Sequence, residues 1–415
     1  MKIAYLNPSG QLGGAERMLL DVLASVRGAE PQWELHLVVS EEGPLVERAK
    51  ALGVPVTVLP FPAALARLGD AGAGGPAGEQ GNGRALLQGL VSSAPAAASY
   101  LRALRRVLRE LAPDVIHTNG FKMHVLGVWA CSRARRTPVI WHIHDYVSPR
   151  PVMACLLKRY AARCAAAIAN SRSVAEDLRS TCGERLEVHT VYNGIDLENF
   201  APTGPRLDLD ALSGMAPCAP GTIKFGMLAT LARWKGHEIF LRAMSLVPPA
   251  LPVRGYVAGG ALYRTNGSQH SLEELKGLID DLGVSRRIGL TGFVEQPASL
   301  MRALDVIVHA STQPEPFGLV IAEGMACGRA VIASHAGGAS ELIDADINAL
   351  AHPPGDAEKL AQRMTLLATN PELRARLGAA GRITAELRFD RARLATELIP
   401  IYRKAASRPR PNSAE

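Results

Sequence analysis

The sequence predicts two α/β domains, each built on a doubly wound parallel sheet. At 415 residues the chain exceeds the size at which one hydrophobic core usually stops growing. Short apolar runs rich in β-forming residues alternate with longer helical patterns, which is typical of βαβ units. The alternation stops over residues 201–220, which are rich in Pro, Asp and small residues, and then starts again. Hydrophobic residues make up 47% of the chain and charged residues 20%, which argues against global disorder.

The first domain is expected over residues 1–200. Its predicted strands cover residues 2–6, 35–39, 54–59, 115–117, 138–142, 166–169 and 188–191, and its helices include 15–27 and 173–180. Residues 63–83 are rich in Gly, Ala and Pro, and most of them are expected to form a mobile surface loop.

Residues 201–220 are interpreted as the linker, and the second domain is expected over 221–388. Its predicted strands cover residues 224–229, 253–258, 288–291, 306–309 and 330–333. A last helical pattern at 391–404 lies within a C-terminal segment, 389–405, that is expected to return to the first domain. Residues 406–415 are expected to be a disordered tail. Ligands of open α/β sheets bind beyond the carboxyl ends of the strands, so site residues should follow strands directly.

The composition argues against membrane-spanning and secreted classes. No stretch approaches the roughly 20 apolar residues of a membrane-spanning helix, and the N-terminus is too short and polar for a secretory signal. The six cysteines lack C-x-x-C spacing, as expected for free thiols in a reducing compartment: Cys131, Cys155, Cys164, Cys182, Cys218 and Cys327. A cytoplasmic location is therefore predicted.

The net charge of +7 is unevenly distributed. Residues 84–163 contain thirteen Lys or Arg against three acids. The densest part, Arg102 to Arg109, places arginines beside leucines at helical spacing. One interpretation is a solvated helix face packed by its leucines, and the other is contact with an anionic membrane at its inner face. A nucleic-acid partner is disfavoured because stacking aromatics and a binding motif are lacking.

Two motifs follow predicted strands. Gly13-Gly14-Ala15-Glu16 opens a helix, where backbone N–H groups can approach a phosphate closely. The dinucleotide fingerprint G-x-G-x-x-G is absent there, which argues against a dehydrogenase. The stronger signal runs from Gln313 to Gly328, where a Pro-Phe-Gly turn opens a helix between Glu315 and Glu323. This segment offers N–H donors for phosphates and carboxylates for hydroxyls.

These motifs and their order make the sequence resemble the retaining GT-B glycosyltransferases called family 4, over nearly the whole chain. The residues that carry the resemblance are Gly13-Gly14-Ala15-Glu16, Pro113-Asp114-Val115-Ile116-His117, His144-Asp145, Val191-Tyr192-Asn193-Gly194-Ile195-Asp196, Trp234-Lys235-Gly236, Thr291-Gly292-Phe293 and the 315–323 block, followed by Gly337-Gly338-Ala339-Ser340-Glu341. The resemblance implies two Rossmann-like domains facing a central cleft, with the acceptor on the first and the nucleotide sugar mainly on the second.

The resemblance also implies roles for individual residues. Glu315 would contact hydroxyls of the transferred sugar, Glu323 the ribose, and Lys235 the donor phosphates. The implied catalytic residues are His144, Glu315 and Lys235. The implied donor-binding residues are Gly13, Gly14, Arg233, Lys235, Gly292, Phe293, Glu315, Phe317, Gly318, Leu319, Val320 and Glu323.

One position departs from the family pattern: Thr230 stands where an arginine is usual, five residues before Lys235. Arg233 is a candidate to supply the missing guanidinium. The departure leaves open a non-catalytic relative that binds a nucleotide sugar, and the shared architecture leaves open a GT-B sugar-nucleotide epimerase.

His144 aligns with a family histidine that contacts the reacting sugar or assists the acceptor, and Asp145 is a candidate to orient it. Strand periodicity places His142 and His144 on one side, so a metal pair is an alternative. The resemblance implies instead a metal-independent reaction without a cofactor. It would move a hexosyl unit from a nucleotide-diphosphate sugar to a glycan or lipid-linked acceptor with retention of configuration, in cell-envelope polysaccharide or glycolipid synthesis.

Overall fold

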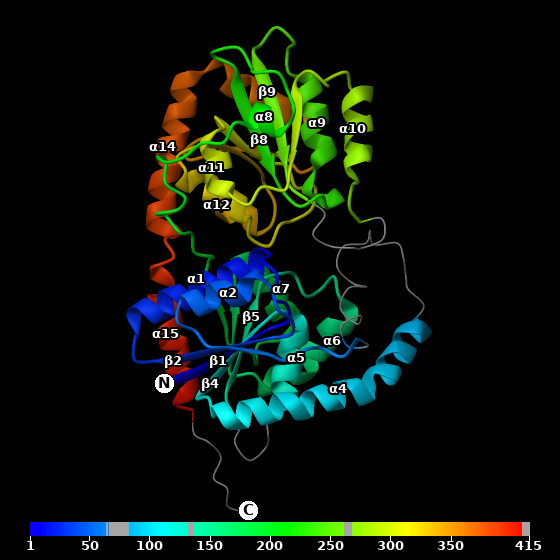
Figure 1. Cartoon of the computed structure of the whole chain (residues 1–415), viewed down its shortest axis with the longest axis vertical. Coiled ribbons are helices and arrows are strands. Elements are labelled where there is room, and N and C mark those ends of the chain that lie inside the picture. Colours follow the sequence, from blue (N-terminus) through cyan, green and yellow to red (C-terminus); the bar gives the residue numbers. More distant parts are fainter. Residues whose placement is uncertain (64, 66–82, 132–136, 261–267, 409–415) are drawn as a thin grey trace, which may run out of the picture. The chain divides into compact units, whose positions relative to one another are not determined.

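The computed structural model describes residues 1–63, 65, 83–131, 137–260 and 268–408 (Figure 1). Most of the loop expected at 63–83 and of the tail expected at 406–415 lies outside these ranges. The chain divides into two compact units, one formed by Met1–Gly194 with Arg391–Glu415 and the other by Ile195–Asp390. Within the part of the chain described, no helix has the length and apolar character needed to cross a membrane.

The first unit contains a parallel sheet of seven strands in the order β3-β2-β1-β4-β5-β6-β7. Since the order runs outward from β1 to β3 in one direction and from β4 to β7 in the other, the sheet is doubly wound. The strands are β1 (Lys2–Asn7), β2 (Glu34–Val39), β3 (Val56–Val58), β4 (Val115–Asn119), β5 (Val139–Ile143), β6 (Ala166–Ala169) and β7 (Val188–Thr190).

Helices cover both faces of this sheet, because successive strand residues point to opposite sides. In β1, Ile3 and Tyr5 join one buried cluster with α1, α2 and α15, whereas Ala4 and Leu6 join the cluster beneath α4 to α7. The helices are α1 (Gly14–Ala29), α2 (Pro44–Ala51), α4 (Gly83–Leu111), α5 (Phe121–Ala130), α6 (Pro151–Tyr160), α7 (Arg172–Cys182) and α15 (Arg393–Ala406), with a short 3-10 helix η2 (Ala161–Arg163).

The second unit contains a parallel sheet of six strands in the order β10-β9-β8-β11-β12-β13. Its strands are β8 (Ile223–Leu228), β9 (Val253–Ala258), β10 (Ile288–Gly292), β11 (Val306–His309), β12 (Ala330–Ser334) and β13 (Leu350–His352). Its helices are α8 (Leu209–Leu212), α9 (His237–Leu246), α10 (Leu272–Asp281), α11 (Pro297–Arg302), α12 (Leu319–Ala326), α13 (Ala357–Thr369) and α14 (Pro371–Arg388), with short 3-10 helices η3 (Arg233–Lys235) and η4 (Gly338–Glu341).

The prediction of two doubly wound parallel sheets is confirmed, with local differences. β3 is shorter than the predicted strand 54–59, and β13 was not predicted, since Leu-Ala-His is a three-residue run without a β-branched residue. β4 continues two residues beyond the predicted 115–117, through Thr118 and Asn119. This extension matters for the site, because it places a buried amide side chain at the carboxyl end of β4.

Candidate active site

A close approach of two loops in the second unit sets the position of Lys235. Gly236 follows Lys235 with φ +83°, and a Cβ atom there would lie 1.9 Å from the carbonyl oxygen of Ala310, just after β11. Only glycine adopts this conformation and leaves room for that carbonyl. The Thr312 amide also donates to the Trp234 carbonyl at 2.8 Å. The loop after β8 is therefore fixed against the loop after β11, which carries Glu315.

Lys235 and Glu315 form an ion pair in this corner. The ammonium Nζ lies 2.5 Å from Glu315 Oε1, and the two side chains are only 19% and 10% exposed. The ammonium also lies 4.1 Å from the ring centroid of Trp234, within range of a cation–π contact. The lysine charge is therefore held in a partly desolvated position.

The second carboxylate oxygen of Glu315 is held by two residues at the end of β11. His309 Nε2 lies 2.8 Å from Oε2, and the Ser311 hydroxyl donates to the same oxygen at 2.6 Å. Burial by itself raises the pKa of Glu315, but the neighbouring charges of Lys235 and His309 hold the pKa well below its usual range. Glu315 is thus an ionised, fixed hydrogen-bond acceptor. The sequence interpretation missed His309 and Ser311, although two polar residues at the end of a buried strand were a usable signal.

Helix α12 begins directly after this loop. Gly318 precedes it with φ +96°, and the buried Phe317 ring packs edge-on against Phe389 with centroids 5.9 Å apart. Leu319 and Val320 form the first turn, where N–H groups lack partners within the helix and the dipole favours an anion. Glu323 lies on the same helix and is half-buried.

The remaining candidates of the second unit lie after neighbouring strands. Gly292 ends β10 with φ +71°, and Phe293, which follows it, is 59% exposed. Thr230 is half-buried after β8. The Arg233 guanidinium donates to the carboxylate of Glu274 at 2.8 and 3.1 Å and contacts His270. A contact between Arg233 and a donor phosphate would compete with this ion pair.

In the first unit, His144 follows β5 and is half-buried. Its Nε2 is hydrogen-bonded to Asn119 Oδ1, and Asn119 Nδ2 donates to Asn7 Oδ1 at 2.6 Å. The sequence makes Asp145 a candidate to orient His144, but the structure does not support that role. The Asp145 carboxylate accepts instead from Arg150 at 2.6 Å and from the Tyr146 amide at 2.8 Å. Asn119 was missed because the predicted strand stopped before it.

The Gly13-Gly14 turn is joined to the same network. Gly14 opens α1, and the Gly13 amide donates to Glu16 Oε2 at 3.0 Å. Glu16 Oε1 accepts from Asn7 Nδ2 at 3.4 Å, and burial raises the pKa of this carboxyl. One amide of the turn is therefore engaged by a side chain of its own helix.

Buried histidines lie behind His144. The rings of His142 and His144 have centroids 4.1 Å apart, His142 Nδ1 lies 3.2 Å from His117 Nε2, and the Tyr402 hydroxyl lies 2.9 Å from His117 Nδ1. Burial lowers the pKa of His117 and of His144 to about 3. Among the described residues no three His, Cys, Asp or Glu side chains gather in an arrangement that could hold a metal ion.

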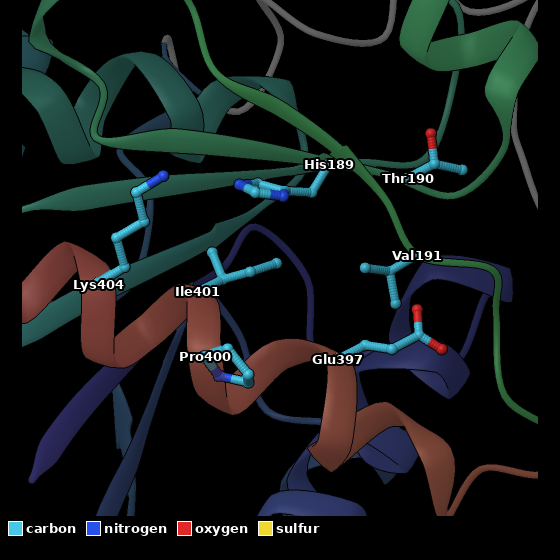
Figure 2. Close-up of a pocket in the computed structure, with 7 residues that line it drawn as sticks. All are labelled: His189, Thr190, Val191, Glu397, Pro400, Ile401 and Lys404. Carbon is cyan, nitrogen blue, oxygen red and sulfur yellow. The ribbon is translucent and has the colours of Figure 1, made fainter.

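A separate surface hollow of about 320 Å³ lies between β7 and α15, and Figure 2 shows the side chains that line it. It is lined by His189, Thr190, Val191, Glu397, Pro400, Ile401 and Lys404. No residue predicted for donor binding or catalysis lines it.

The two doubly wound sheets, with polar clusters at the carboxyl ends of their strands, have the architecture of the GT-B class. The profile described as "Glycosyltransferase Family 4" matches residues 12–199, and the profile described as "Glycosyl transferases group 1" matches residues 218–384. The chain belongs to this family of retaining glycosyltransferases, which confirms the predicted family and enzyme class.

Individual relatives agree with this assignment. The chain is 29% identical over 315 residues to a D-inositol 3-phosphate glycosyltransferase of Xylanimonas cellulosilytica, covering 71% of this chain and 73% of that one. Anabaena HepE, solved in complex with UDP, superposes with a TM-score of 0.76 at 27% identity, covering 96% of this chain and 99% of HepE. HepE has also been solved with UDP-glucose. A sucrose-phosphate synthase of Thermosynechococcus elongatus shares the fold at 20% identity with a TM-score of 0.72, covering 97% and 98% of the two chains.

Proposed function

We propose that this glycosyltransferase moves a hexose from a UDP-sugar to a glycan or lipid-linked acceptor in cell-envelope polysaccharide or glycolipid synthesis. The proposed hexose is glucose. The observation that carries the proposal is the buried Lys235–Glu315 pair beside the N-terminus of α12. The similarity to HepE, which binds UDP and UDP-glucose and matches almost the whole chain, supports uracil as the base and glucose as the sugar.

The donor would bind to the Ile195–Asp390 unit. An ammonium group has three N–H donors, so Lys235 can contact a phosphate oxygen while it remains paired with Glu315. The first-turn amides of Leu319 and Val320 offer further donors to the diphosphate. Glu315, which is ionised and held by His309 and Ser311, is suited to accept from sugar hydroxyls. Glu323 would accept from the ribose hydroxyls.

Lys235 is proposed to act mainly in the transfer step, where it stabilises the charge on the leaving group. The bond between the sugar C1 and the phosphate oxygen breaks, and negative charge builds up on the departing UDP. A fixed cation in a partly desolvated site stabilises that charge more in the transition state than in the ground state. The acceptor oxygen forms its bond to C1 on the face that UDP leaves, and its proton passes to the leaving phosphate oxygen. No protein nucleophile is required.

The reaction is proposed to need no metal ion, because Lys235 and the amides of α12 supply the positive electrostatic environment. Transfer should continue at an unchanged rate in excess EDTA. A loss of rate that added Mg²⁺ or Mn²⁺ restores would contradict this part of the proposal.

The unit formed by Met1–Gly194 and Arg391–Glu415 is proposed to bind the acceptor, in a cytoplasmic protein that touches the inner face of the membrane through α4. On this helix Leu104 and Leu108 are buried, whereas the four arginines of the 102–109 segment are exposed. The leucines therefore anchor the helix. Arg106 pairs with Glu110 at 3.0 Å and Arg105 donates to the Trp129 carbonyl at 2.7 Å, which makes Arg102 and Arg109 the candidates to contact anionic headgroups.

Co-sedimentation with vesicles containing phosphatidylglycerol tests the membrane contact. The double variant Arg102→Glu, Arg109→Glu should lose binding, and the matched control Arg185→Glu, Arg286→Glu, which has the same charge change on exposed arginines elsewhere, should retain it. Equal binding by both variants, or binding by wild type that is independent of anionic lipid, would contradict the contact.

Two measurements test the donor. In a thermal-shift panel of UDP, GDP and ADP sugars, UDP-glucose should raise the melting temperature most, since a ligand of the native state stabilises it. Release of UDP should then depend on an added glycan or polyprenyl-linked acceptor. Stabilisation by UDP-glucose without transfer to any acceptor would instead favour a non-catalytic protein that binds the nucleotide sugar. Thr230, which stands where the family usually has an arginine, is the residue that keeps this alternative open.

A further inference from the structure

Three polar side chains lie at the carboxyl ends of three adjacent strands of the first sheet. Asn7 ends β1, Asn119 ends β4, and His144 follows β5. The two asparagines are fully buried. A buried amide or imidazole is costly unless each of its donors faces an acceptor and each acceptor faces a donor. The hydrogen-bond directions of these three side chains can therefore be deduced one after another, starting from Asn7.

The amide of Asn7 has one possible orientation. The atom that faces the Ser9 carbonyl at 2.6 Å must be the Nδ2 donor, since a carbonyl only accepts. The same nitrogen points toward the Glu16 carboxylate. Asn7 therefore presents its oxygen, Oδ1, to Asn119.

Asn119 is then fixed in turn. Its Nδ2 donates to Asn7 Oδ1 at 2.6 Å and approaches the Ala15 carbonyl at 3.5 Å. Both partners are acceptors, so the other end of the Asn119 amide is the oxygen, and this oxygen faces His144 Nε2. An oxygen there requires His144 to carry its proton on Nε2.

The other ring nitrogen of His144 then holds a lone pair. His144 Nδ1 is enclosed and has no hydrogen-bond partner among the described residues. Burial keeps the imidazole neutral at ordinary pH, since it lowers the pKa of His144 to about 3. A neutral ring with Nε2–H can accept a hydrogen bond at Nδ1 and cannot donate one there.

We infer that Asn119, itself held by Asn7, is a positioning residue that fixes His144 as the Nε2–H tautomer, so that Nδ1 is an acceptor for a hydroxyl of the reacting sugar or acceptor. The identity of that hydroxyl rests on the proposed function. The tautomer does not, because it follows from contacts within the first unit alone. His144 would then orient a hydroxyl and would not act as a general acid.

Nitrogen-15 NMR of the ligand-free protein labelled at histidine tests the tautomer directly. Wild type should show a protonated Nε2 and an unprotonated Nδ1 for His144, assigned by loss of the signals in His144→Gln. In Asn119→Ala the fixed acceptor is gone, and the two tautomers should mix. The surface control Asn199→Ala should leave the spectrum unchanged. A proton on Nδ1 in wild type, or an unchanged spectrum in Asn119→Ala, would overturn the inference.

Kinetics and pH separate positioning from a structural role. Asn119→Ala should lower kcat, measured per mole of folded protein, by roughly tenfold to a hundredfold, because a displaced contact group commonly has that effect. It should also lower the melting temperature, since the buried Asn7 oxygen and the His144 N–H lose their partner. Asn119→Asp places a carboxylate on His144, which raises its pKa. The acidic limb of the kcat profile should therefore move toward neutral pH in this variant. Wild-type profiles in both variants would overturn the positioning role.

The two proposals fail differently. If wild type transfers no sugar but shows the Nε2–H tautomer, which mixes in Asn119→Ala, the assigned function is wrong and the deduction about Asn119 and the His144 tautomer stands. If transfer occurs and the tautomer is Nδ1–H, the function stands and the inference about Asn119 is wrong.

Discussion

Lys235 and Glu315 lie 80 positions apart in the sequence, yet their charged atoms are 2.5 Å apart and both side chains are largely buried. They meet because β8 and β11 are neighbours in the second sheet and because Gly236 brings its loop against the Ala310 carbonyl. The electrostatic attraction within such an ion pair is strong, because little water screens the two charges. It therefore has both a structural and an electrostatic role.

Replacement of Lys235 by alanine should lower kcat/KM for sugar transfer by on the order of a hundredfold or more, as deletion of a preorganised electrostatic group commonly does. Steady-state release of UDP from UDP-glucose in the presence of the active glycan or polyprenyl-linked acceptor measures the effect. Lys276→Ala, which removes an exposed lysine of α10, is the matched control and should have wild-type activity. Turnover by Lys235→Ala within a few-fold of wild type would reject the role of Lys235 in stabilising the leaving group.

Glu323→Ala should weaken binding of UDP in the absence of acceptor, because the ribose hydroxyls lose a carboxylate that accepts their hydrogen bonds, a contact typically worth about 1.5 to 3 kcal/mol. Calorimetric titration with UDP measures the affinity. Glu358→Ala removes an exposed glutamate of α13 and should bind UDP as wild type does. An affinity of Glu323→Ala equal to that of the control would exclude the ribose contact.

Gly236→Ala should lower both stability and activity. Its added Cβ would overlap the Ala310 carbonyl at 1.9 Å, in a backbone conformation with φ +83°. To relieve the overlap the loop must move, and Lys235 moves with it. Urea unfolding and UDP release together measure the two losses.

The control for this substitution is Gly277→Ala on α10. Apart from the backbone of its own helix and its chain neighbours, no atom of the described residues lies within 4 Å of a Cβ atom built at Gly277. Alanine there should stabilise the helix by about 0.5–1 kcal/mol, because glycine is the weaker helix former. If Gly236→Ala behaves like Gly277→Ala, the close approach at Ala310 does not position Lys235.

The stability of the protein should fall as the pH drops below about 6.5, the ordinary value for histidine. Burial lowers the pKa of His117, His144 and His237 to about 3 in the folded state. Between these two values the unfolded chain binds protons that the folded chain does not, so stability is fully present above pH 6.5 and is lost toward pH 3. Melting temperatures at pH 7.5, 6 and 5 should therefore decrease in that order.

His237 allows this effect to be isolated, because it is fully buried and neither ring nitrogen has a hydrogen-bond partner in the described structure. In His237→Phe the loss of unfolding free energy between pH 7.5 and 5 should be smaller by about 2 kcal/mol, the linkage expected for one such group. A pH dependence identical to that of wild type would show that His237 titrates normally.

The sequence by itself determined the two sheets and the family, because strand and helix periodicity are local and the motifs retain their order along the chain. It also placed most of the predicted site residues after strands that the structure contains. It did not reveal what holds them. The partners of Glu315, which are His309 and Ser311, depend on how one side chain turns within a loop. No spacing of residues encodes that direction.

The same limit explains the correction at His144. Sequence proximity favoured Asp145 as the orienting residue, but successive residues near a strand point to different sides, and Arg150 engages that carboxylate. Asn119, 25 positions away, lies beside His144 because β4 and β5 pair in parallel. Periodicity fixes which elements form, whereas the pairing of side chains across adjacent strands is decided only when the sheet is assembled, since it depends on register, burial and the need to satisfy every enclosed polar group.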